Sequence, residues 1–120
     1  MTRGATDSKP VVLALVRDLI FASKISASAR AAGIEARIVR DPAQLPSLSG
    51  SLLLADLNQP GVIAAAAEWK RVSGMPVIGF VSHVDATTIA TAREAGLDRI
   101  VARNGFVEQL PRILSELGRQ

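Results

Sequence analysis

The chain has 120 residues, of which 48% are hydrophobic, 21% charged and 3% aromatic, and its formal net charge is +3. These values suit one globular domain with an aliphatic core. The absence of Cys excludes disulfides, thiolate metal sites and thiol chemistry. Scattered basic residues and few aromatics argue against a nucleic-acid surface. No apolar run reaches the roughly 18 residues of a membrane span, so we expect a cytoplasmic protein without membrane contact.

The amino-terminal third predicts a lead segment, a strand and a helix. Residues 1–9 are polar and predict a disordered lead without the hydrophobic segment of a signal peptide, and residues 10–120 predict a single domain. The continuous apolar run 11–16 is typical of a strand buried on both faces of a parallel sheet. Asp18 can then cap a helix that runs to about residue 32.

The middle of the chain predicts two more strands with a short helix between them. Residues 34–40 alternate between apolar and polar types, which favours a half-covered strand near the sheet edge. Asp41 and Pro42 fit the N-cap and first position of a helix, which Pro46 should limit to one or two turns. The apolar run after Ser51 predicts a buried strand that ends at Asp56.

The second half alternates in the same way. We expect a helix over 61–73, a strand over 76–81, a helix from Asp85 to about 95, a strand over 100–102 and a helix over 106–117. Trp69 is expected to pack against the core rather than to bind a ligand. Pro111 should limit or bend the last helix. Five strands alternating with helices predict an α/β, flavodoxin-like, doubly wound parallel sheet of order 2-1-3-4-5, with helices on both faces.

Polar side chains follow four of the predicted strands: Arg17 and Asp18, then Asp56, then Ser82 and His83, then Arg103. The carboxyl ends of parallel strands meet at one edge of the sheet, where α/β proteins bind their ligands. A carboxylate, a hydroxyl and a cation from three strands would suit a phosphoryl group. In this hypothesis Asp56 accepts the group, and Ser82 and Arg103 bind its oxygens. His83 is expected to be a loop residue, because the chain has no second His and no Cys with which to build a metal site.

Three segments resemble the receiver domains of bacterial response regulators, and the resemblance covers residues 11 to about 117. Leu54-Ala-Asp-Leu-Asn-Gln-Pro-Gly61 is similar to the segment around the phosphoaccepting Asp, with Asn58 two residues after it. Pro76-Val-Ile-Gly-Phe-Val-Ser82 is similar to the fourth strand with its switch hydroxyl. Ala95-Gly-Leu-Asp-Arg-Ile-Val-Ala-Arg103 is similar to the run that leads to the site lysine. The resemblance implies Asp56 as phosphoacceptor, with a kinase or a downstream signalling protein as partner.

The residues after the first strand depart from the family pattern. Receivers carry two acidic residues there that bind Mg²⁺ beside the acceptor, whereas Val16 and Arg17 stand at those positions and Asp18 lies one residue further on. Mg²⁺ requires near-octahedral oxygen ligation, and a guanidinium nearby would oppose it. We therefore expect no cofactor, with Mg²⁺ at most weakly held by Asp56 and Asp18.

The switch positions depart as well. Arg103 replaces the family's Lys, Asn104 replaces a Pro, and Ile100 replaces the switch aromatic. His83 follows Ser82 where the family has a small residue.

These departures favour a stand-alone receiver-like domain of a two-component pathway, not an enzyme, whose site is degenerate and which acts through protein contacts. In this hypothesis Arg17 or Arg103 pairs with Asp56 and lowers its pKa. Two alternatives stay open: a single-domain response regulator phosphorylated on Asp56, and an interaction module without phosphorylation. The partner or a second copy would bind the face of the fourth helix, fifth strand and fifth helix, with the residues Ile89, Ala92, Arg93, Ile100, Phe106 and Leu110.

Overall fold

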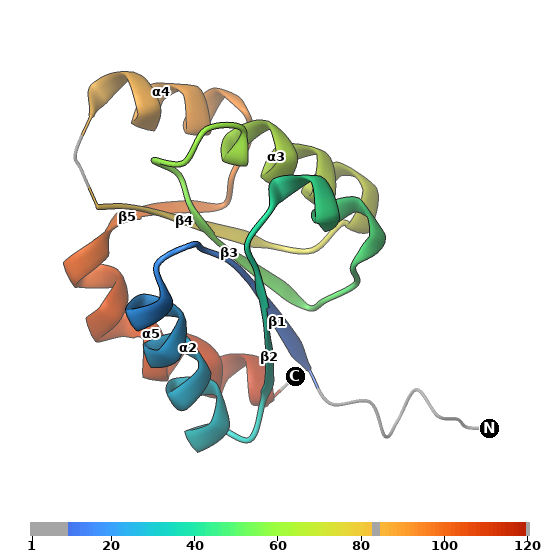
Figure 1. Cartoon of the computed structure of the whole chain (residues 1–120), viewed down its shortest axis with the longest axis vertical. Helices are drawn as coiled ribbons and strands as arrows, with labels where there is room; N and C mark the ends of the chain where they lie inside the picture. The colour runs from blue at the N-terminus through green and yellow to red at the C-terminus, as the bar shows by residue number, and fades with distance from the viewer. Residues whose placement is uncertain (1–9, 83–84, 120) are drawn as a thin grey trace.

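The computed structural model describes residues 10–82 and 85–119, and its centre is a parallel sheet of five strands in the order β2-β1-β3-β4-β5 (Figure 1). This confirms the predicted topology. The strands are β1 (Val11–Leu15), β2 (Glu35–Val39), β3 (Leu52–Asp56), β4 (Val77–Val81) and β5 (Arg99–Ala102). The helices are α2 (Leu19–Ala31), the 3₁₀ helix η1 (Pro42–Ser47), α3 (Val62–Ser73), α4 (Ala86–Glu94) and α5 (Arg103–Gly118).

The helices cover both faces of the sheet, as Figure 1 shows: α2 and α5 lie on one face, and η1, α3 and α4 lie on the other. Successive strand residues point to opposite faces, so each central strand contributes to two cores. In β1, Val12 and Ala14 pack under α2 and α5, whereas Leu13 and Leu15 pack under η1 and α3. This double burial explains why β1 and β3 are continuous apolar runs.

The helix boundaries follow the capping residues that the sequence predicts. The Asp18 side chain accepts hydrogen bonds from the backbone N–H groups of Ile20 and Phe21 at the start of α2. Asp41 and Asp85 cap η1 and α4 in the same way. Gly74 ends α3 with a φ of 73°, a left-handed conformation that favours glycine.

The last helix differs from the prediction in two respects. It begins at Arg103 rather than at residue 106, because Ala102 is extended and the Asn-Gly pair after Arg103 continues the helix instead of forming a turn. Pro111 lies inside α5 and does not end it. The helix is held by a buried apolar stripe that includes Phe106, Leu110 and Leu114, whose packing outweighs the local preference of proline.

The predicted partner face is partly wrong. Ala92 and Phe106 are fully buried, and Leu110 is 1% exposed, so these three belong to the core rather than to a surface. Ile89 and Ile100 are half-buried, and Arg93 is exposed. Trp69 is a packing residue, as predicted: it is 4% exposed, and its Nε1 donates to the carbonyl of Leu48 at 3.1 Å. None of the helices within the described ranges is both long and apolar enough to cross a membrane.

Three phenylalanines close the core on the α2 and α5 side. The Phe80 ring lies 4.8 Å from both the Phe21 and the Phe106 ring, measured between centroids, and it stacks on Phe106 at an interplanar angle of 16°. Since these rings come from α2, β4 and α5, they fix the two helices against the sheet directly below the carboxyl edge.

Candidate functional site

Asp56 is the last residue of β3 and is half-buried at the carboxyl edge of the sheet. Its Oδ1 accepts a hydrogen bond of 3.1 Å from the backbone N–H of Asn58, which fixes the turn toward α3. Burial raises the pKa of Asp56 above its ordinary value, and this effect outweighs the Asn58 N–H and the charge of Arg103, which both lower it. The site therefore disfavours the charged carboxylate.

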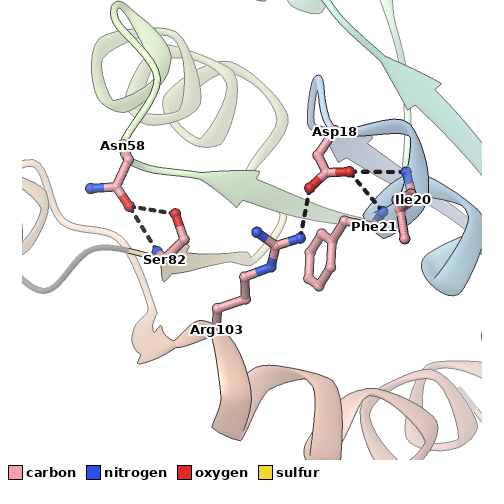
Figure 2. Close-up of polar contacts among 6 residues, drawn as sticks. All are labelled: Asp18, Ile20, Phe21, Asn58, Ser82 and Arg103. Carbon is pink, nitrogen blue, oxygen red and sulfur yellow. Dashed lines mark hydrogen bonds and ion pairs between the residues drawn. The ribbon is translucent and has the colours of Figure 1, made fainter.

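The Arg103 side chain is held by α2 rather than by Asp56. Its Nη2 donates to Asp18 Oδ2 at 2.9 Å, and its guanidinium carbon lies 4.1 Å from the centroid of the Phe21 ring (Figure 2). The other carboxylate oxygen of Asp18 caps α2. The hydrogen bond from Arg103, supported by the N–H of Phe21, lowers the pKa of Asp18. We call these three residues, Asp18, Phe21 and Arg103, the arginine clasp.

Ser82 and Asn58 form a second polar pair, which Figure 2 shows apart from the arginine clasp. The Asn58 carboxamide oxygen accepts from the backbone N–H of Ser82 at 2.7 Å and from its hydroxyl at 3.1 Å. These two bonds tie the loop after β3 to the end of β4. The Ser82 hydroxyl, the predicted ligand of a phosphoryl oxygen, therefore donates its proton to Asn58.

The structure brings the predicted residues to one edge but pairs them differently from the prediction. Within the described part of the chain, no hydrogen bond or ion pair joins Asp56 to an arginine, and the pKa of Asp56 is raised rather than lowered. The expected arginine–Asp56 pair is therefore wrong. Arg103 contacts Asp18 because the helix cap places that carboxylate beside the first turn of α5. Arg17 lines a different hollow, and His83 lies outside the described residues.

The residues at this edge do not fit a Mg²⁺ site. Asp18 is the second carboxylate whose charge acts on Asp56, but one of its oxygens caps α2 and the other pairs with Arg103. Both oxygens of Asp18 are therefore already engaged, and a metal ion would compete with these contacts for the carboxylate. Over residues 10–82 and 85–119, no three acidic or His side chains form a group that could hold a metal ion.

Comparisons with known proteins define the class of the fold. No protein-family model matches the sequence, and no curated protein matches it. Solved structures do match: a CheY-like receiver domain from Methanospirillum hungatei is 16% identical with a TM-score of 0.75, covering 93% of this chain and 98% of its own. A response regulator from Thermotoga maritima is 12% identical with a TM-score of 0.74, covering 94% and 100%.

A third match is the receiver domain of a sensor histidine kinase from Pseudomonas aeruginosa, solved with a magnesium ion in its active-site cleft. It is 19% identical with a TM-score of 0.74, and the match covers 94% of this chain and all of that one. The chain therefore has the fold of response-regulator receiver domains. The resemblance drawn from the three sequence segments is confirmed at the level of the fold.

Two features of the site were not predicted from the sequence. Asp18 was considered as a helix cap and as a weak metal ligand, but not as the partner of Arg103, which lies 85 residues away. Phe21 was not considered at all. The sequence did place Asp18 after β1 and Arg103 after β5, and the carboxyl ends of these strands lie at the same edge of the sheet. However, β1 and β5 are not neighbouring strands, so this signal alone did not indicate that the two side chains meet.

Asp56→Asn should raise the thermal unfolding midpoint at pH 7 by a few degrees. The neutral amide keeps the oxygen that accepts from Asn58 and avoids burying a charge. Because the folded pKa of Asp56 is raised, the wild type should lose stability relative to this variant as the pH rises through that pKa. Below the ordinary value of 3.8 the two midpoints should coincide. Thermal melts across this pH range measure the difference.

Asp98→Asn is the matched control, because the pKa of Asp98 is shifted in the opposite direction and the variant should change stability in the opposite direction. Burial opposes the ionisation of Asp98, but the N–H of Val77 and the ammonium of Lys70 outweigh it, so its pKa is lowered. This variant should be less stable than the wild type at pH 7, and the difference should vanish as the pH falls through that lowered pKa. An Asp56→Asn variant that melts below the wild type at neutral pH would contradict the burial argument.

Proposed function

We propose that this chain is a receiver-like signalling domain of a two-component type pathway, acting in the cytoplasm through protein contacts and not as an enzyme. Its acceptor site is degenerate. The observation that carries the proposal is the arginine clasp: the cation that would neutralise a phosphoryl group on Asp56 is bound to Asp18 and stacked on Phe21.

Phosphoryl transfer depends on groups that stabilise the charge developing on the equatorial oxygens. At this edge Arg103 is engaged by Asp18, and the Ser82 hydroxyl donates to Asn58. The acidic pair that would hold a metal ion is replaced by Val16, which is buried, and Arg17, which lines another hollow. Arg103 and Ser82 would therefore each have to break an existing contact before they could bind a phosphoryl group on Asp56.

Two exposed apolar residues favour a protein partner. Leu19 and Ile20 form the first turn of α2 beside the arginine clasp and are 63% and 74% exposed. Adjacent exposed aliphatic side chains on a surface helix are typical of a protein contact. A partner bound there would lie directly against Asp18, so the arginine clasp supports the shape of this surface.

Beryllofluoride, a mimic of the phosphoryl group, tests the proposal. The titration is followed by amide NMR in the presence of an about tenfold molar excess of Mg²⁺ over protein, so that the metal is not limiting. We expect no saturable shift at Leu57, Asn58 or Ser82. Asp56→Asn is the control, since it removes the carboxylate to which the mimic would bind. Saturable, Mg²⁺-dependent shifts that this substitution abolishes would show a working acceptor and would overturn the proposal.

A further inference from the structure

An apolar hollow of about 620 Å³ lies toward the other edge of the sheet, where β3 and β4 begin. It runs between α3 and η1, which lie side by side on one face of the sheet (Figure 1). Its apolar walls come from three segments: Pro46 and Leu48 before β3, Ala65, Trp69 and Val72 on α3, and Met75 before β4. The residues of the acceptor edge do not line it.

The hollow is already formed in a single chain. The Trp69 ring is 4% exposed, and its Nε1 donates to the carbonyl of Leu48, which joins the two walls. The Ser73 hydroxyl oxygen accepts from the N–H of Met75 at 3.1 Å, which fixes the chain where it leaves α3. Another molecule could therefore bind here without rearranging the fold.

Large hydrophobic side chains at the rim of this hollow are exposed to solvent. Over residues 10–82 and 85–119, four such side chains are exposed, and they form two pairs. Leu19 and Ile20 begin α2, whereas Val72 and Met75, which are 71% and 41% exposed, lie at the end of α3 beside the hollow. Exposed aliphatic side chains next to an apolar hollow are typical of a surface that a protein covers.

The residues of α3 at the rim have a spacing that reads the same in both directions. They are Ala65, Glu68, Val72 and, just after the helix, Met75, separated by three, four and three residues. A two-fold axis beside residue 70 would place Ala65 opposite the partner's Met75, a small side chain opposite a long one. Glu68 would lie opposite the partner's Val72. Such alternating spacings allow antiparallel helices to pack, and a two-fold interface requires a self-complementary surface.

The charges on α3 also fit a second copy. Arg71 Nε donates to Glu68 Oε1 at 3.0 Å, and Lys70 pairs with Asp98 at 2.9 Å. These charges balance, although the whole chain carries +3, so two copies can meet here without net repulsion. Across the two-fold axis, each Glu68 would also approach the partner's Arg71. Two carboxylates and two guanidinium groups would then lie at the centre of the interface.

We propose that two copies of this chain associate through the α3 face, which we define as Ala65, Glu68, Arg71, Val72 and Met75. The two α3 helices run antiparallel, and Met75 of each copy enters the hollow of the other. The inference does not depend on the proposed function, because the acceptor edge takes no part in it. It also differs from the face of α4, β5 and α5 that the sequence predicted for a second copy.

Sedimentation velocity between roughly 10 µM and 1 mM tests the association, because an interface built on one helix is small and weak. The mass should rise from the 12.6 kDa of one chain toward twice that value. A chain that stays monomeric, or that grows beyond a dimer, would overturn the proposal. So would a monomer whose single tryptophan, Trp69, transfers energy to bound anilinonaphthalene sulfonate, which would assign the hollow to a small apolar molecule.

Lysine variants locate the interface. Val72→Lys and Met75→Lys should each weaken the dimer roughly tenfold or more, because each buries an unpaired charge. Both side chains are exposed in the single chain, so the fold should be retained. Leu19→Lys and Ile20→Lys are the matched controls, since they add the same charge at equally exposed aliphatic positions and should leave the dimer unchanged. Equal weakening in all four variants would overturn the proposal.

Charge reversal tests the two-fold arrangement. Glu68→Lys places four positive charges at the centre of the interface, and Arg71→Glu places four negative ones, so each variant alone should be mainly monomeric. An equimolar mixture restores opposite charges across the axis and should form a dimer that contains one copy of each. A mixture that stays monomeric would overturn the antiparallel arrangement of the α3 helices.

Discussion

Phe80→Ala should lower the free energy of unfolding by about 3–5 kcal/mol, the cost of deleting a large buried ring. Phe80 lies on β4, is 1% exposed, and contacts both Phe21 and Phe106. The cavity would lie where α2 and α5 meet the sheet. With a total stability of about 5–15 kcal/mol for a domain of this kind, the variant should be close to unfolding at 37 °C. Urea unfolding followed by circular dichroism measures the loss.

Phe80→Leu is the conservative control, because it keeps an apolar side chain in the same place. We expect it to cost clearly less than Phe80→Ala, since the remaining cavity is smaller. Equal losses for the two variants would indicate that ring stacking, rather than the filled volume, stabilises this core. A loss below about 1 kcal/mol for Phe80→Ala would contradict the packing that the structure shows.

Gly79→Ala should destabilise the fold by about 1–3 kcal/mol through overpacking. Gly79 lies in the middle of β4, and a Cβ there would come within 2.5 Å of Leu57 Cδ1 and 2.7 Å of its Cγ. Leu57 is 3% exposed, so its side chain has little room to move aside. Because Leu57 follows Asp56 in the chain, the same displacement should shift the amide resonances of Asp56 and Asn58 in NMR spectra.

A double variant isolates that contact. Leu57→Ala alone should cost about 2–5 kcal/mol, because it leaves a cavity. In Gly79→Ala with Leu57→Ala, the new methyl group occupies part of the space that Leu57 filled. The combined loss should therefore be smaller than the sum of the two single losses, by about 0.5 kcal/mol or more. Additive losses would show that the two residues do not compete for the same space.

The sequence by itself was sufficient to predict the topology. The continuous apolar runs of β1 and β3 indicate strands that are buried on both faces of the sheet. The alternation of apolar and polar residues in β2 indicates a strand that is buried on one face. The caps Asp18, Asp41 and Asp85 mark helix starts because a side-chain oxygen satisfies N–H groups within two or three residues. These are local interactions, and local interactions can be predicted from neighbouring residues.

The last helix shows where local reasoning fails. The sequence predicted a last helix that begins at residue 106 and that Pro111 limits or bends, yet α5 runs from Arg103 to Gly118. The burial of Phe106 against Phe80 and Phe21 is a contact between segments far apart in the chain. Its contribution exceeds the local preference of Pro111 against a helix interior, and no pattern inside the segment reports it.

The sequence predicted which residues lie at the carboxyl edge of the sheet, but not which of these side chains contact one another. Strand order alone places Asp18, Asp56, Ser82 and Arg103 at one edge, which the sequence determined. Which carboxylate Arg103 binds was decided by the tertiary structure: the capped start of α2 holds Asp18 and Phe21 next to the first turn of α5. Burial then sets the pKa of Asp56 above its ordinary value. Side-chain pairing and desolvation depend on distances of a few ångströms between separate elements, which the order of residues does not contain.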